Sequence, residues 1–271
     1  MRNASNLQSK TQNPKSKIQG TALGITLALT QTLSVAAEPE MDHAPWDTLL
    51  RRYVTGGLVD YRGIQRERHV LERYLAQLAT TNPDTLPSHN AQLAFWINAY
   101  NACVVKGVLA RYPLKSVKEV NGFFDGIRYT VGGQDLTLNE MEAKGRALGD
   151  WRVHVAFVCA SSSCPRLRSE AYVPERLEAQ LTDQATQFLR DASRGLRFEA
   201  APQTLWVSKM FKWYATDFVP SGKITAENLL PLLRPSLDPT VAGALQRQHP
   251  RVRFLDYDWT LNDQDQGRTT R

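Results

Sequence analysis

The sequence predicts a single α+β domain in which helices pack on a mostly antiparallel sheet. Amphipathic helical patterns are mixed with short β-rich runs, without the β-α-β rhythm of a parallel sheet. No repeat or low-complexity linker interrupts residues 40–262, so we expect one domain over residues 38–262. With 271 residues, of which 42% are hydrophobic, the chain is long enough to bury a large core.

The first part of the domain is predicted to be mainly helical. Apolar residues recur at helical spacing over residues 45–54 and 68–79, and residues 56–64 form a short extended connection between them. Ser88 is placed to cap a longer helix over residues 91–111. Both sides of that helix are apolar, so we expect it to be buried nearly all round.

The second part of the domain is predicted to alternate hairpins with helices. A glycine pair separates two β-rich runs in residues 127–138, which indicates a hairpin. Thr137 and Glu140 have the spacing of a capping box that opens a helix over residues 138–148. The remaining predicted elements are a strand over 151–160, a helix from 174 to 194, a hairpin of 196–200 with 204–208, helices over 209–219, 225–234 and 239–248, and a strand over 252–259.

Residues 1–37 have the pattern of a secretory signal peptide. Four basic residues and no acidic residue precede an apolar stretch, and Val35 and Ala37 are placed for cleavage. We therefore expect a mature chain in an oxidising compartment, either periplasmic or secreted. No other segment is apolar and long enough to span a bilayer, and residues 263–271 are expected to form a disordered tail.

Charge and composition exclude several classes of partner. Removing the four N-terminal charges from the formal net charge of +6 leaves +2, which gives no case for nucleic-acid binding. Three cysteines without a CxxC pair and five scattered histidines do not indicate a zinc site, so we expect no metal and no cofactor. Phosphate-binding glycine loops and nucleophile elbows are also missing from the sequence. The expected partner is an unidentified small molecule, peptide or glycan.

The stretch HVAFVCASSSCPRL, residues 154–167, carries the strongest candidate chemistry. On a regular strand His154 faces away from Cys159, whereas Cys164 can meet either residue across the serine-rich turn. Spacing and compartment favour a Cys159–Cys164 disulfide. The alternative is a cysteine nucleophile whose pKa is lowered by an imidazolium or a helix N-terminus. Cys103, which lies mid-helix among apolar residues, is expected to be an inert core thiol.

Two amides lie three residues apart on the predicted helix over residues 91–111. Asn98 and Asn101 share one side of the helix, and burying them is costly unless their donors and acceptors are paired. One interpretation is that they bond to loop backbone and hold a neighbouring segment. The other is that they point into a cleft and orient a base or a substrate carbonyl.

Four segments together resemble the bacterial DUF547 family of uncharacterised proteins. The segments FWINAYNA, HVAFVCASSSCPRL, VSKMFKWYATDF and FLDYDWTLN occur in the order and spacing of that family and cover most of residues 45–262. The resemblance implies an exported protein of unknown function, distantly similar to papain-like or transglutaminase-like cysteine hydrolases. In those enzymes the cysteine precedes the histidine, whereas here His154 precedes both candidate cysteines. The family's recurrent positions in this sequence are Asn98, Tyr100, Asn101, His154, Cys159, Cys164, Pro165, Lys209, Tyr214, Asp217, Asp256, Asp258 and Asn262.

Two functions remain open from these residues, beside a periplasmic thiol–disulfide protein cycling Cys159 and Cys164, against which the lack of a CxxC motif counts. The first is a cysteine-type hydrolase or acyltransferase of the cell envelope, with Cys164 or Cys159 as nucleophile and His154 as general base. Asn98 would orient that base or stabilise an oxyanion. The second is a non-catalytic binding domain for a ligand or peptide, stiffened by the Cys159–Cys164 disulfide. The candidate binding residues are Asn101, Tyr100, Arg166, Lys209 and Asp217.

Overall fold

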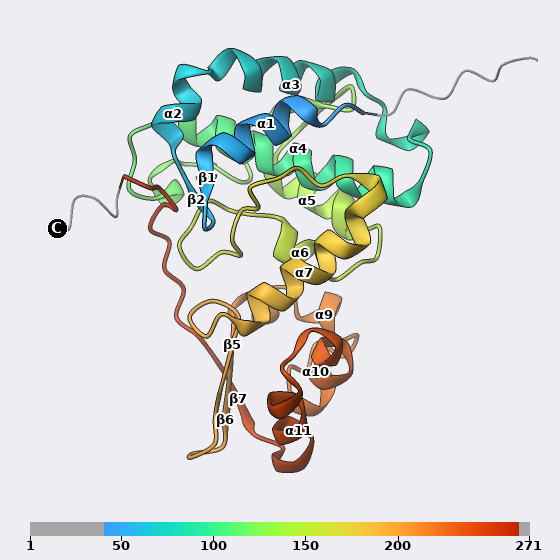
Figure 1. The fold of residues 1–271 in the computed structure, drawn as a ribbon, viewed down its shortest axis with the longest axis vertical. Coiled ribbons are helices and arrows are strands. Elements are labelled where there is room, and N and C mark those ends of the chain that lie inside the picture. The colour runs from blue at the N-terminus through green and yellow to red at the C-terminus, as the bar shows by residue number, and fades with distance from the viewer. Residues whose placement is uncertain (1–40, 266–271) are drawn as a thin grey trace, which may run out of the picture. The chain divides into compact units, whose positions relative to one another are not determined.

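The computed structural model describes residues 41–265, and these form helices with three small sheets (Figure 1). The predicted α+β class is therefore confirmed. The predicted signal peptide, residues 1–37, lies outside the described residues, as do residues 266–271. None of the helices within residues 41–265 combines the length and the apolar character that crossing a bilayer requires.

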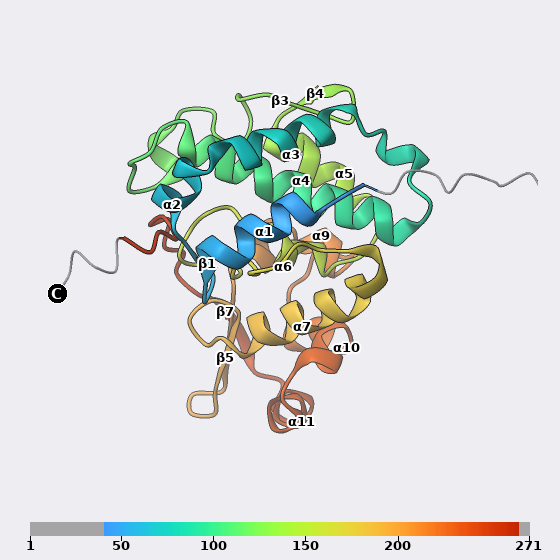
Figure 2. The same ribbon diagram turned by 45° about the horizontal axis from the view of Figure 1, so that its top comes forward.

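A helical layer surrounds the buried helix α4 (His89–Leu109). The Ser88 side chain accepts a hydrogen bond from the amide of Ala91, and 17 of the 21 residues of α4 are buried, as its two apolar sides predict. Helices α3 and α5 pack directly on α4, and α1 packs on α3 (Figure 2). The surrounding helices are α1 (Ala44–Tyr53), α2 (Tyr61–Arg66), α3 (Arg68–Thr80) and α5 (Leu138–Arg146).

Two antiparallel hairpins connect these helices. The predicted hairpin is present, with its glycine pair at φ of 62° and 71°, a conformation that suits residues without a Cβ. Thr137 and Glu140 form the predicted capping box at the start of α5. The strands are β1 (Val54–Thr55), β2 (Leu58–Val59), β3 (Tyr129–Val131) and β4 (Gln134–Leu136). Short 3₁₀ helices lie at Pro83–Thr85, Val117–Glu119, Pro174–Arg176 and Arg234–Ser236.

The predicted strand over residues 151–160 is wrong. The chain instead forms a four-residue helix, α6 (Val153–Ala156), followed by an extended segment outside any sheet. The amide of Asn101 supplies the backbone partners that a neighbouring strand would have given. It donates to the carbonyl of Ala156 and accepts from the N–H of Val158, both at 2.9 Å.

The second half of the domain contains a three-stranded sheet, and its hairpin is the predicted one. The last strand, β7, is shorter than predicted and pairs parallel to β6, so residues 255–259 leave the sheet toward the helical layer. The predicted helix over residues 209–219 is broken into two at Tyr214, whose φ of −114° is not helical. The elements are α7 (Leu177–Arg190), β5 (Leu196–Glu199), β6 (Thr204–Val207), α8 (Met210–Trp213), α9 (Ala215–Phe218), α10 (Ala226–Leu233), α11 (Pro239–Gln248) and β7 (Arg251–Phe254).

Two hydrophobic cores are joined through α6 and α7. One core surrounds α4, and the other lies among α7, the β5–β7 sheet and α10. Helix α7, which lies between the helical layer and the β5–β7 sheet (Figure 1), contributes Leu181 to the first core and Phe188 to the second. The first three residues of the expected tail are held by the fold: Asp263 is buried and forms a parallel bridge with Val59.

Candidate active site

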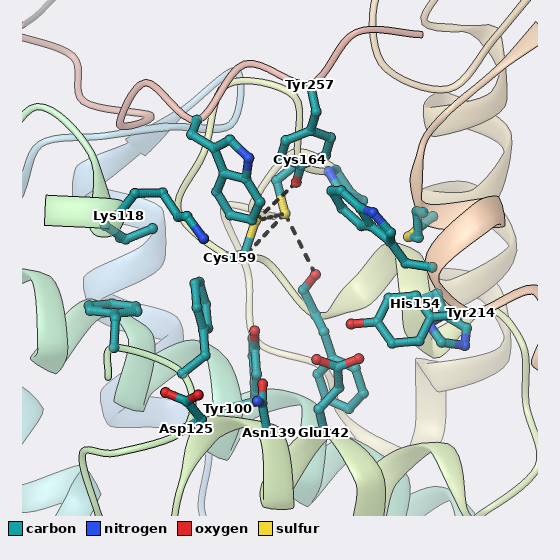
Figure 3. Close-up of a pocket in the computed structure, with 18 of the residues that line it drawn as sticks. Tyr100, Lys118, Asp125, Asn139, Glu142, His154, Cys159, Cys164, Tyr214 and Tyr257 are labelled. Atoms are coloured by element: carbon teal, nitrogen blue, oxygen red, sulfur yellow. Dashed lines mark hydrogen bonds between the residues drawn. The ribbon is translucent and has the colours of Figure 1, made fainter. Parts of the chain in front are cut away.

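A cavity of about 510 Å³ lies beside the two cysteines (Figure 3). One wall comes from α4 and α5 and presents Tyr100 and Glu142. The facing wall comes from the loop after α6 and the segment after β7, and presents Cys159, Cys164 and Tyr257. A volume of this size is ordinary for a small-molecule site.

The loop between the cysteines is folded so that their sulfurs face each other. Cys159 continues the extended segment held by Asn101, and Ala160 turns the chain at a φ of 60°. The Cys164 amide donates to the carbonyl of Ser161 at 3.1 Å, which closes the turn. The two sulfurs lie 2.8 Å apart, and the Cys159 amide donates to the Cys164 sulfur at 2.9 Å.

The predicted disulfide is not formed in this structure. A covalent S–S bond is about 2.05 Å long, so sulfurs 2.8 Å apart are not bonded to each other. Cys159, Cys164 and Cys103 are all free. Cys103 is fully buried, and burial raises the pKa of its thiol to about 12, which fits the expected inert core residue.

The two thiols differ in acidity. Burial acts to raise the pKa of the Cys159 thiol. Hydrogen bonds with the Cys164 thiol and with the hydroxyls of Ser161 and Tyr257, each hydroxyl 3.1 Å from the sulfur, outweigh burial and lower the pKa of Cys159 to about 7. For Cys164, burial and the neighbouring Cys159 both raise the pKa well above its ordinary value. The lowered pKa favours ionisation at Cys159, whereas Cys164 accepts hydrogen bonds from the amide and the thiol of Cys159.

His154 pairs with an acid and not with a cysteine. Its Nε2 lies 3.0 Å from Oδ2 of Asp217, and its ring packs between Tyr214 and Phe218. In Figure 3 it lies on the far side of Tyr214 from the two sulfurs. Burial lowers the pKa of His154 to about 4 although Asp217 acts to raise it, so the imidazole is neutral at pH 7. His154 therefore does not provide the imidazolium that one sequence-based hypothesis required to lower the pKa of a cysteine.

Asn98 and Asn101 hold neighbouring segments in place. Asn98 donates to the carbonyl of Tyr172 at 2.7 Å and accepts from its N–H at 3.0 Å. Asn101 does the same for the segment that leads into Cys159. Both amides are therefore occupied by backbone groups, and the structure does not bring Asn98 to the cavity wall.

The candidate binding residues are divided between the cavity and the surface. Tyr100 lines the cavity, and Asp217 reaches it only through His154. Arg166 forms an exposed ion pair with Asp191 at 3.1 Å, outside the cavity. Lys209 lies 3.7 Å from Asp256 and is likewise absent from the cavity wall.

Glu142 and Tyr257 are cavity residues that the sequence analysis missed. Burial raises the pKa of Glu142, although its hydrogen bond from the Tyr214 hydroxyl acts to lower it. Its position was readable: Leu138, Met141, Glu142 and Gly145 recur at helical spacing, and all four are buried. An acid on the apolar stripe of a helix indicates a buried carboxyl group. Tyr257 lies in an irregular segment, where no pattern distinguishes its face.

Comparison with known proteins gives a match over part of the chain. Residues 83–189 match the sequence model of a family described as "Protein of unknown function, DUF547". The matched segment contains α4, α5, α6 and both cavity cysteines, and it ends before Tyr214 and Tyr257. The match supports the family resemblance over these residues. No curated protein and no solved structure showed significant similarity to the chain.

Proposed function

We propose that the chain is a thiol-dependent hydrolase or acyltransferase whose nucleophile is Cys159. The observation that carries the proposal is a half-buried thiol in the cavity wall whose pKa is lowered to about 7. A lowered pKa increases the share of the thiolate at neutral pH, and the thiolate is the nucleophilic form. The proposal favours Cys159 over Cys164, because burial and its partner keep Cys164 protonated.

The reaction needs little beyond these groups. The thiolate adds to the carbonyl carbon of an ester or amide, the bond to the leaving oxygen or nitrogen breaks, and a thioester forms on Cys159. Water or another acceptor then takes the acyl group and frees the thiolate. Glu142, whose raised pKa favours the protonated form, is our candidate donor of the proton that the leaving group needs.

His154 has an indirect role in this proposal. The Asp217 carboxylate fixes its ring, and the ring packs on Tyr214 at a centroid distance of 4.5 Å. The Tyr214 hydroxyl in turn bonds to Glu142. His154 and Asp217 are therefore positioning residues for Glu142 in the proposed mechanism.

Alkylation of the native protein tests the nucleophile. With iodoacetamide under reducing conditions, we expect one fast thiol whose rate is half-maximal near pH 7 and which Cys159→Ser removes. Cys164→Ala removes the thiol whose interaction lowers the pKa of Cys159, so it should move the midpoint upward while Cys159 still reacts. A midpoint near the ordinary cysteine value, or fast alkylation of Cys164 in its place, would refute the proposal.

The short sulfur–sulfur distance supports a second candidate, the binding domain with a structural disulfide. Oxidation would remove two protons and two electrons, which a disulfide-exchange partner would accept, and would join sulfurs that already lie 2.8 Å apart. Alkylation and intact mass without reductant separate the two candidates. One reactive thiol, mapped to Cys103, supports the disulfide, whereas three thiols support the nucleophile.

Export remains part of the proposal. The basic and then apolar order of residues 1–37 supports cleavage near Glu38 and a periplasmic or secreted location. The intact mass of the chain from its native source tests this directly. A mature chain that retains residues 1–37 would exclude cleavage.

A further inference from the structure

We propose that the cavity binds an acylated saccharide, with a sugar ring on an aromatic platform and the acyl carbon at Cys159. This inference names the substrate class of the proposed function and rests on it. It is drawn from the two walls of the cavity, which differ in chemistry.

One wall carries an aromatic platform formed by Trp213, Tyr257 and Trp259. The two tryptophan rings are stacked at 6.0 Å and 29°, and Tyr257 packs against both at 4.8 and 4.7 Å. Trp213 is 48% exposed, which is rare for a large apolar side chain in the described residues. A ring left half open at the wall of a cavity indicates a ligand that covers it.

The faces of this platform attract positively polarised groups. The Lys118 ammonium lies 4.9 Å from the centre of the Trp259 ring. The C–H hydrogens on the flat side of a pyranose ring carry a small partial positive charge, weaker than that of an ammonium group. They therefore pack favourably on the negative face of an indole ring. Trp213 also lines the cavity, and within the described residues no lysine or arginine lies over its ring.

The opposite side of the cavity is polar and unpaired. Asn121, Asp125 and Asn139 line it; all three are solvent-exposed, and within residues 41–265 their side chains make no hydrogen bond or ion pair. Amides and carboxylates bind hydroxyl groups well, because a hydroxyl both donates and accepts. A ligand with one apolar face and a rim of hydroxyls therefore fits the two walls together.

Cys159 and the platform share a residue. The Tyr257 hydroxyl lies 3.1 Å from the Cys159 sulfur, while the Tyr257 ring packs against both tryptophans. A sugar on the platform thus presents its substituents to the thiolate. Attack on an O- or N-acyl carbon breaks the bond to the sugar oxygen or nitrogen, which takes up a proton, and leaves the acyl group on Cys159.

Calorimetric titration of the full chain carrying Cys159→Ser tests the inference without turnover. The probes are the tetramer of N-acetylglucosamine, its de-N-acetylated counterpart, and a tetrapeptide mixture. We expect the acylated tetramer to bind more tightly than the other two. Trp213→Ala should weaken its binding about tenfold, which corresponds to one ring-stacking contact.

Trp206→Phe is the matched control, because Trp206 lies on β6 outside the cavity and packs between two arginines. It should leave the affinity unchanged. Absence of saccharide binding at millimolar concentration, binding that ignores Trp213→Ala, or preference for the peptides would each overturn the inference.

If iodoacetamide modifies Cys159 near pH 7 while saccharides fail to bind, the proposed function stands and only the substrate class is wrong. If saccharides bind while Cys159 is unreactive, the aromatic platform is a sugar-binding site, and the proposed acyl transfer to Cys159 is refuted.

Discussion

Hydrogen-bond donors, and not a neighbouring base, account for the acidity of Cys159. A half-buried thiol loses hydration of its charged form, so burial alone would make it a poor nucleophile. Two hydroxyls and a second thiol surround the sulfur and stabilise the thiolate in place of water. The site therefore depends on groups that keep their protons at neutral pH. Burial raises the pKa of one of them, Tyr257.

The two serines of the loop offer a test of this account. The Ser161 hydroxyl lies 3.1 Å from the Cys159 sulfur, whereas the hydroxyl of its neighbour Ser162 donates to the carbonyl of Thr260. Ser161→Ala should raise the pKa of Cys159 by roughly one unit, because one donor to the thiolate is lost. The pH profile of alkylation measures the shift. Ser162→Ala is the control, and an equal shift in both variants would contradict the account.

His154 should make folding stability depend on pH. Burial lowers its pKa to about 4 in the folded state, compared with 6.5 in an unfolded chain. Between these values the unfolded state binds the extra proton, so stability is complete above pH 6.5 and falls as the pH drops toward 4. A shift of this size corresponds to about 3 kcal/mol.

Urea unfolding at pH 7 and pH 4 measures this loss. His154→Gln should reduce the difference between the two free energies of unfolding, while the exposed His69→Gln should not. His43, whose pKa burial also lowers to about 4, accounts for part of the dependence that remains. An unchanged difference in His154→Gln would show that its imidazole is not kept neutral by the fold.

Regular elements were predictable from local pattern, and irregular ones were not. Helix α4, the glycine-paired hairpin and the capping box of α5 each carry a local pattern in sequence. Helix α6 has four residues, too few to show a helical period, and its valines favour a strand. The parallel partner of β6 lies more than 40 residues away, beyond the reach of any local pattern.

The candidate site was predictable to the same extent. His154, Cys159 and Asn101 stood out because their residue types are chemically distinctive or costly to bury. Their pairing depends on how α9 and the C-terminal segment return to α6, which no local pattern encodes. The sequence therefore indicated the segments that form the site but did not indicate that Asp217 lies beside His154.

At the scale of a single helix, α4 carries a buried asparagine, Asn98, and an exposed one, Asn90, which can serve as its control. Asn98→Ala leaves the N–H and the carbonyl of Tyr172 unpaired in the core, so we expect a loss of about 3 kcal/mol in unfolding free energy. Asn90 lies at the exposed start of the same helix, and Asn90→Ala should cost less than about 0.5 kcal/mol. Denaturant unfolding of both variants gives the comparison. If both variants lose the same unfolding free energy, water must satisfy the Tyr172 backbone groups in Asn98→Ala.

Helix α7 connects the two hydrophobic cores of the described domain. The first turns of α7 pack in the core around α4, and its last turns pack in the core beside the β5–β7 sheet. Gln184 lies between the two and donates to the carbonyls of Val155 and Arg166, at 2.8 Å each. A rigid helix shared by two cores couples them, because neither core can open without exposing part of α7.

This coupling predicts one cooperative unfolding transition. Leu181→Ala in the first core and Phe188→Ala in the second should each cost about 3 kcal/mol, since each leaves a cavity among buried side chains. Both should lower the same melting transition, seen equally by circular dichroism and by tryptophan fluorescence, with equal calorimetric and van't Hoff enthalpies. If Phe188→Ala splits the transition in two, the second core is an independent unit. In that case the segment that carries Trp213 and Tyr214 would unfold at a lower temperature than the segment that carries Cys159, and the cavity would open before the first core melts.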